Sequence, residues 1–158
     1  MKILMVCLGN ICRSPLAEGI LRKKTQEAGI DVEIDSAGFE SCNVGDCPDY
    51  RTLENAKRNG LDISNLRARL FRTEDFDRFD KIYVMDYNNM RMVRRMARNE
   101  ADMAKVDYIL SAVYPNSKAP QFVADPYYMD IDAFQRVYDQ LDEACEIICN
   151  KLKNNEQL

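Results

Sequence analysis

The stretch that decides the fold is residues 3–22, ILMVCLGNICRSPLAEGILR. Its apolar start predicts a buried strand from Lys2 to Val6. A polar loop follows, and then a helix for which Ser14 is the expected N-cap and Pro15 the expected first residue. A strand, a tight loop and a helix start in this order aim backbone N–H groups and the positive end of a helix dipole at one point. Such a point attracts a tetrahedral anion, so this stretch predicts an α/β fold with an anion-binding loop.

The loop itself carries reactive chemistry. It opens with the thiol of Cys7 and closes with the guanidinium of Arg13, in the pattern Cys-(x)5-Arg-Ser. The planar fork of arginine can hold two phosphoryl oxygens at once. The same positive field favours the thiolate form of a cysteine, which is the nucleophilic form. A buried cysteine beside a helix N-cap is the simpler structural alternative, but it leaves Arg13 unexplained. The loop therefore predicts a phosphate site with Cys7 as nucleophile.

Length and composition narrow the class of protein. The 158 residues fit one domain, expected to span 1–158 with a frayed tail over about 154–158. The formal net charge of −4 does not favour nucleic acid or an acidic membrane as partner. The first apolar run is too short for a secretion signal, and no run approaches a membrane span. We expect a soluble cytoplasmic protein without membrane insertion, with a monomer as the favoured oligomeric state.

The chain has six cysteines and no histidine. Without a secretion signal the cysteines are expected to be reduced thiols. No CxxC pair occurs and histidine ligands are missing, so no metal site is expected. Cys145 and Cys149 lie four apart in an apolar helical pattern, which favours core packing. The missing histidine also means that any general acid must be a carboxylate, tyrosine, lysine or thiol.

The rest of the chain alternates strand and helix patterns. Further strands are expected at residues 32–35 and 81–85 and within 106–113, and further helices at 49–60, from 73, at about 88–98 and at about 131–153. This alternation predicts a parallel sheet covered by helices on both faces. Ligands of such folds bind at the carboxyl ends of the strands, which is where Cys7 and Asp86 fall.

The residues VCLGNICRSP at 6–15, with Asp125-Pro126 in a late loop, resemble the low-molecular-weight protein tyrosine phosphatase family. The resemblance covers nearly the whole chain. It implies a flavodoxin-like doubly wound fold, with a four-stranded parallel sheet and helices on both faces. It also implies hydrolysis of phosphotyrosine and small aryl phosphates through a phosphocysteine on Cys7, with Arg13 binding the phosphate. No cofactor is implied, and the partners would be phosphotyrosine proteins.

The second half of the site is expected near the C-terminus. The resemblance implies that Asp125 protonates the leaving oxygen and then acts as base for the hydrolytic water. Taken alone, Asp125-Pro126 could be an ordinary turn. Tyr127 and Tyr128 match paired aromatic positions that wall the substrate cleft, where two rings suit a flat aryl phosphate. They could also be simple packing residues.

Supporting roles carry over from the same resemblance. The loop residues that would surround the phosphate are Leu8, Gly9, Asn10, Ile11 and Cys12. Ser14 would donate its hydroxyl to the Cys7 sulfur. Asn10 would hold the loop in a strained shape, with Ser36 beside it. Cys12 would form a reversible disulfide with Cys7 under oxidation, which makes the family redox-sensitive, although a small apolar filler is the structural alternative.

Two acidic residues match family positions, and two other residues depart from them. Asp86 matches a residue that orients Arg13 or the following helix, and Asp49 matches one at the edge of the cleft. Cys42 stands where many members have an aromatic wall of the cleft, so substrate preference is expected to differ. Leu66 stands where many have a histidine that contacts the loop asparagine, which is expected to leave that asparagine short of one partner.

Two other functions fit parts of the pattern. A thiol-dependent arsenate reductase shares the fold and loop type but needs further cysteines after the third strand, and residues 86–103 contain none. A non-catalytic phosphate-binding module would keep Arg13 but would not need Cys7 or Asp125. Phosphatase activity is therefore the preferred hypothesis.

Overall fold

Four parallel strands form the central sheet, in the order β2-β1-β3-β4. A computed structural model describes all residues, Met1–Leu158. The strands are β1 (Lys2–Val6), β2 (Glu33–Ala37), β3 (Lys81–Val84) and β4 (Val106–Tyr108). Val6 is in register with Ala37 on one side and Val84 on the other, so three strands end at the same edge. This order is that of a flavodoxin-like doubly wound sheet, as predicted.

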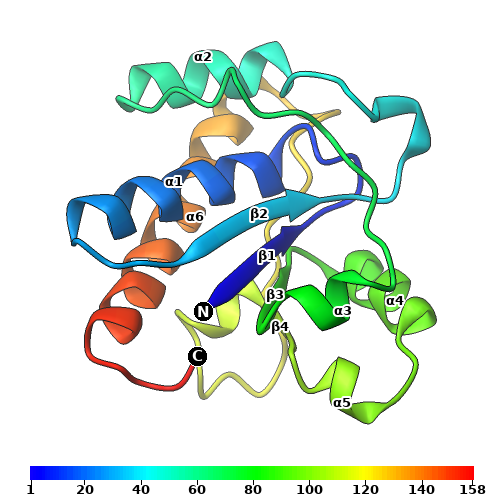
Figure 1. Cartoon of the computed structure of the whole chain (residues 1–158). Helices are drawn as coiled ribbons and strands as arrows, with labels where there is room; N and C mark the ends of the chain where they lie inside the picture. Colours follow the sequence, from blue (N-terminus) through cyan, green and yellow to red (C-terminus); the bar gives the residue numbers. More distant parts are fainter.

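Helices cover both faces of the sheet (Figure 1). The helices α1 (Arg13–Glu27) and α6 (Ile131–Lys153) pack together on one face, and α2 (Tyr50–Arg58) packs against α6. The opposite face carries α3 (Asp75–Arg78), α4 (Tyr87–Met96) and α5 (Glu100–Met103). Two 3-10 turns, η1 (Ser41–Asn43) and η2 (Ile109–Ser111), follow β2 and β4.

The alternation of side chains along β1 divides the core into two clusters. Ile3 and Met5 belong to the larger cluster, under α1 and α6, while Leu4 and Val6 belong to the smaller one, under α3 and α4. This is the period of two expected for a strand buried on both faces. Every one of these four side chains is fully buried, so the first strand is the centre of the fold.

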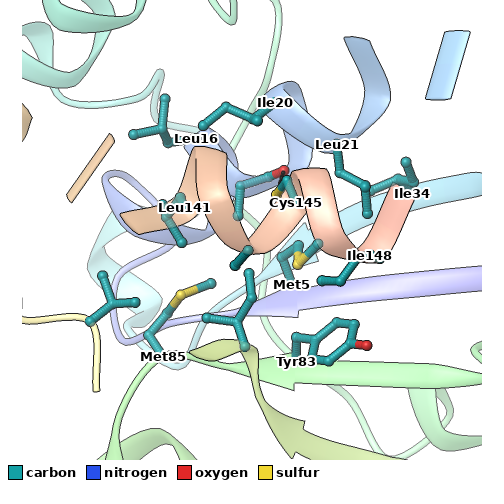
Figure 2. Close-up of a cluster of buried hydrophobic side chains, with 14 of the residues drawn as sticks. Met5, Leu16, Ile20, Leu21, Ile34, Tyr83, Met85, Leu141, Cys145 and Ile148 are labelled. Carbon is teal, nitrogen blue, oxygen red and sulfur yellow. Dashed lines mark hydrogen bonds between the residues drawn. The ribbon is translucent and has the colours of Figure 1, made fainter. Parts of the chain in front are cut away.

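The predicted stripe of α6 faces the larger cluster. Figure 2 shows Leu141, Cys145 and Ile148 of this helix in the same buried cluster as Met5 and Tyr83 of the sheet. The helix spans the predicted range, and Cys145 is fully buried in the core, as its position in the apolar pattern indicated. Its thiol lies 3.7 Å from the carbonyl oxygen of Ala17 in α1.

The start of α1 differs from the prediction. Arg13 is its first residue and Cys12 its N-cap position, with no side-chain capping bond, so Ser14 is not the N-cap. The physical reason is that the Ser14 hydroxyl already bonds two groups of the preceding loop, as described below. The end agrees with the prediction, because Gly29 adopts the left-handed conformation (φ 68°) that terminates a helix.

Other elements agree within a few residues, with two exceptions. Asp49 caps α2 as expected, accepting a hydrogen bond from the Arg51 N–H at 2.9 Å. The short helix α5 was not predicted, and β4 is only three residues long before η2 begins. In the tail, whose fraying stays a prediction, Lys81 Nζ donates to a terminal oxygen of Leu158 at 3.1 Å.

We predict that Leu141→Ala lowers the free energy of unfolding by about 2–5 kcal/mol, because it empties a filled site in the larger cluster. Ile131→Ala in the same helix is the matched control. Its side chain is 54 % exposed, so a change below about 0.5 kcal/mol is expected. Denaturant unfolding of both variants measures the difference, and equal losses would contradict this account of the core.

Candidate active site

The loop between β1 and α1 packs directly on the end of β2. Cys7 N–H donates to the Ala37 carbonyl at 3.2 Å, and Phe39 N–H donates to the Leu8 carbonyl at 2.7 Å. A Cβ on Gly38 would lie 2.7 Å from that Leu8 oxygen and 2.8 Å from the Asn10 nitrogen. Only glycine permits this approach, so Gly38 is a structural requirement of the loop that the sequence pattern alone did not identify.

Asn10 holds the loop in its shape, as expected. It is one of two non-glycine residues with positive φ (55°), a conformation that asparagine tolerates better than most residues. Its Nδ2 donates to the Ser14 Oγ at 2.8 Å and to the Ser36 Oγ at 2.9 Å, and its Oδ1 accepts from the Arg69 N–H at 2.9 Å. The expectation that Asn10 lacks a partner because of Leu66 is therefore wrong. A backbone N–H supplies the missing bond.

A buried chain of hydrogen bonds leads from this asparagine to the thiol. The Ser14 Oγ lies 2.9 Å from the Cys7 Sγ, and both groups are buried. At the other end, the Ser36 hydroxyl donates to the Glu18 carboxylate at 2.6 Å. Burial raises the pKa of Glu18, although Ser36 and Arg22 oppose that shift by binding the charged form. The Cys7 sulfur thus lies at the end of an ordered polar network.

Arg13 lies inside the protein, with only 1 % of its surface exposed. Its Nη1 donates to the Asp86 carboxylate at 2.6 Å and to the Val123 carbonyl at 2.9 Å. Its Nη2 donates to the Asp125 carboxylate at 3.2 Å. Burial works against the charged form, but the neighbouring Cys7, Asp86 and Asp125 outweigh it and raise the Arg13 pKa.

Asp86 was expected to orient either Arg13 or the following helix, and in the structure it contacts both. One carboxylate oxygen binds Arg13, and the other accepts the Asn89 N–H at 2.9 Å as the N-cap of α4. The Asn89 side-chain oxygen in turn accepts a hydrogen bond from the Asp86 N–H, which completes a capping box. The carboxylate therefore fixes the guanidinium relative to the carboxyl end of β3.

A cleft of about 290 Å³ opens over the loop. Its lining contains most of the predicted site residues together with two that were not predicted, Glu40 and Asn43: Cys7, Leu8, Gly9, Ile11, Cys12, Arg13, Glu40, Cys42, Asn43, Asp125, Tyr127 and Tyr128. Glu40 and Asn43 come from the loop around η1, whose shape has no periodic signal in the sequence. Tyr127 and Tyr128 meet edge to face, with ring centroids 4.8 Å apart, and Tyr128 is 94 % exposed. The cleft thus combines a buried anion site with an aromatic rim.

Asp49 is not part of this lining, which corrects its expected place at the cleft. Its N–H donates to the Ile11 carbonyl at 2.8 Å, and its carboxylate binds the Arg51 side chain. Hydrogen bonding to Arg51 lowers the Asp49 pKa against the opposing effect of burial. Asp49 therefore supports the loop between β1 and α1, which we call the phosphate loop, through its bond to Ile11.

The second loop cysteine is a buried, protonated thiol. Burial raises the pKa of Cys12 to about 12, and a hydrogen bond from Thr52 opposes this only in part. All six cysteines are free thiols. No three Cys, Asp or Glu side chains converge to hold a metal ion, and no helix is long and apolar enough to cross a membrane.

Comparisons with known proteins agree with this geometry. The profile of the family described as "Low molecular weight phosphotyrosine protein phosphatase" matches residues 2–158. A phosphatase of that name from Schizosaccharomyces pombe is 42 % identical over 143 residues, which cover 89 % of each chain. The Entamoeba histolytica protein tyrosine phosphatase with Hepes in the active site superposes with a TM-score of 0.87 at 33 % identity, covering 98 % of each chain. Vibrio vulnificus Wzb in complex with benzylphosphonate gives a TM-score of 0.82 at 29 % identity, covering 95 % of this chain and 97 % of that one.

The fold and the site define a protein of the flavodoxin-like α/β class, in which a loop that carries Cys7 and Arg13 lines a cleft. Within that class, the chain belongs to the low-molecular-weight phosphotyrosine protein phosphatase family.

The burial of the thiols leads to a chemical test. In a Cys7→Ser background at neutral pH, we expect iodoacetamide to modify the exposed Cys42 and Cys47 and to spare Cys12 and Cys145. Burial raises the pKa of both spared thiols, so the reactive thiolate is scarce. Peptide mapping by mass spectrometry measures each site. Modification of Cys12 as fast as that of Cys42 would contradict the buried, protonated state.

Proposed function

We propose that this protein hydrolyses phosphotyrosine in proteins, and small aryl phosphates, through a phosphocysteine intermediate on Cys7. The observation that carries the proposal is that Cys7 and Arg13 of one loop line the same cleft as Asp125, which lies 112 residues after Arg13 in the sequence. Membership of the phosphatase family and the aromatic rim of the cleft support the same substrate class. The substrate partners would be phosphotyrosine proteins.

In the first step the loop N–H groups and Arg13 bind the phosphoryl oxygens. The Cys7 thiolate attacks phosphorus, the bond to the tyrosyl oxygen breaks, and Asp125 gives its proton to that oxygen. The loop amides at the start of α1 stabilise the charge of the transferred group. The aryl ring would lie against Tyr127 and Tyr128.

In the second step Asp125, now a carboxylate, takes a proton from water. The resulting nucleophile attacks phosphorus, the sulfur–phosphorus bond breaks, and inorganic phosphate leaves. The Ser14 hydroxyl, 2.9 Å from the sulfur, would donate to the departing thiolate. The enzyme is then ready for another turnover.

The contacts of Arg13 suggest that its two terminal nitrogens, Nη1 and Nη2, have different roles. Nη1 is held by Asp86 and by the Val123 carbonyl, whereas Nη2 contacts only the half-exposed Asp125. A phosphoryl group would replace Asp125 at Nη2 without disturbing the bonds at Nη1. Asp125 would then be released beside the bound phosphate, where it can deliver a proton.

We predict that Cys7→Ser abolishes turnover and that Arg13→Lys loses most of it. A lysine is a point charge, so it cannot hold Asp86 and two phosphoryl oxygens together. Cys47→Ser removes an exposed thiol outside the cleft and should retain normal activity. Steady-state hydrolysis of a phosphotyrosine peptide measures all three variants. Ordinary turnover by Cys7→Ser, or a phosphoenzyme trapped on another residue, would refute the proposed nucleophile.

For Asp125→Asn we expect hydrolysis of phosphotyrosine to fall by roughly a hundred- to ten-thousand-fold, the usual contribution of a general acid. An aryl phosphate with a much more acidic phenol should lose far less, because that phenol departs readily as the anion. Asp132→Asn, which changes an exposed carboxylate outside the cleft, is the control. The values of kcat/KM for the two substrates are compared in each variant, because kcat/KM reports the first step, whereas the second step needs Asp125 as base with either substrate. Equal losses for both leaving groups would show that Asp125 is not the acid.

A further inference from the structure

Arg51, in the first turn of α2, is half-buried and makes several contacts near the cleft. Its Nε and Nη2 bind the two carboxylate oxygens of Asp49 at 3.0 and 2.9 Å. Its Nη1 donates to the Tyr127 carbonyl at 3.0 Å. The guanidinium also stacks on the Tyr127 ring, 5.2 Å from the centroid, and on the Phe134 ring at 4.7 Å. One planar group therefore connects α2, α6 and the loop that carries Asp125.

The α2 end of this connection is fixed to the phosphate loop. Asp49, which binds Arg51, donates its N–H to the Ile11 carbonyl at 2.8 Å. Thr52 is buried in the same turn. The first turn of α2 therefore cannot move without displacing the residues around the phosphate site.

The segment that Arg51 contacts at Tyr127 makes few hydrogen bonds to the rest of the protein. Residues 124–129, which we call the acid loop, follow Val123, whose N–H donates to Met85 at 2.9 Å. Within the acid loop the bonds are local, from Tyr127 N–H to Asp125 and from Met129 N–H to Pro126. Only two hydrogen bonds join the acid loop to the rest of the protein: Arg13 to Asp125 and Arg51 to Tyr127.

These two bonds have different fates during the proposed reaction. The bond from Arg13 to Asp125 must open when a phosphoryl group takes Nη2 and Asp125 turns to the leaving oxygen. Arg51 is not among the residues that line the cleft, so its bond to the Tyr127 carbonyl can persist throughout. It is then the remaining hydrogen bond of the acid loop itself, while Val123, directly before that loop, stays bonded to Arg13 and Met85.

We propose that Arg51 is a positioning residue, which holds the acid loop in place so that Asp125 stays within reach of the leaving oxygen once phosphate has replaced it on Arg13. This inference rests on the proposed role of Asp125 as general acid. Arginine is required because a lysine ammonium cannot bind Asp49 through two parallel bonds, bind the Tyr127 carbonyl and stack on two rings together.

The test is a double-mutant cycle between Arg51→Met and Asp125→Asn. Small errors in placing a catalytic group cost up to about a hundredfold, so Arg51→Met should lower kcat/KM for phosphotyrosine by roughly 10- to 100-fold. The value of kcat/KM with an acidic phenol as leaving group should change less than about threefold, because the first step with that substrate needs no proton from Asp125. Added to Asp125→Asn, the Arg51 change should cost less than about threefold, since the acid it positions is already gone.

Two further variants complete the design. Arg51→Lys keeps the charge and should not restore kcat/KM, and it also provides the measurement if Arg51→Met fails to fold. Arg58→Met removes the same side-chain type from the same helix. Arg58 is exposed and has a single ion pair, to Glu54 at 3.8 Å, so this control should behave as wild type. Circular dichroism confirms that each variant is folded.

The possible failures are distinguishable. If Arg51→Met costs the same factor for both leaving groups, or the same factor in the Asp125→Asn background, then Arg51 acts through Asp49 and the phosphate loop, and the inference is wrong. Full recovery by Arg51→Lys would also overturn it. If instead Asp125→Asn alone loses equally with both leaving groups, the proposed acid itself is wrong, and this inference falls with it.

Discussion

The burial of one guanidinium constrains the whole molecule. Arg13 is almost fully enclosed, and a charge removed from water must be paired and hydrogen-bonded or it destabilises the fold. Its partners at Nη1 come from two distant segments, the turn after β3 and the loop before α6. The phosphate site can therefore form only when the carboxyl edge of the sheet has assembled. The same contacts leave Nη2 of the guanidinium beside Asp125 at the cleft, so stability and the proposed phosphate binding depend on one side chain.

Most of the regular structure could be predicted from the sequence because it is periodic. Local patterns predicted the strand before Cys7, the long helix α6 and the glycine that ends α1. The structure has each of these features at its expected place. The expected N-cap of α1 shows where such a local rule fails. Ser14 is a good N-cap by type, but its hydroxyl is committed to Cys7 and Asn10, and tertiary contacts override the local preference.

The site was predictable only where a motif names the residue. Cys7, Arg13 and Asp125 lie in recognisable patterns and meet in the cleft. Glu40 and Asn43 reach the cleft through an irregular turn, and no spacing rule indicates them. The partner of Asn10 was misjudged for another reason. The family pattern indicates a side-chain donor at position 66, and Leu66 has none. The bond comes instead from the backbone N–H of Arg69. Every residue except proline carries such a group, so the sequence does not indicate which one will bind Asn10.

The close approach of Gly38 to the phosphate loop has a consequence for protein engineering. The Cys-(x)5-Arg segment looks portable, a short linear cassette that could be grafted onto any strand–helix junction. Its conformation, however, depends on a glycine and a hydroxyl from the neighbouring strand and on an amide from a third segment. The smallest unit that could be transplanted with its shape intact is therefore discontinuous, and a graft of the linear segment alone would keep the reactive groups while losing the backbone geometry that presents them to phosphate.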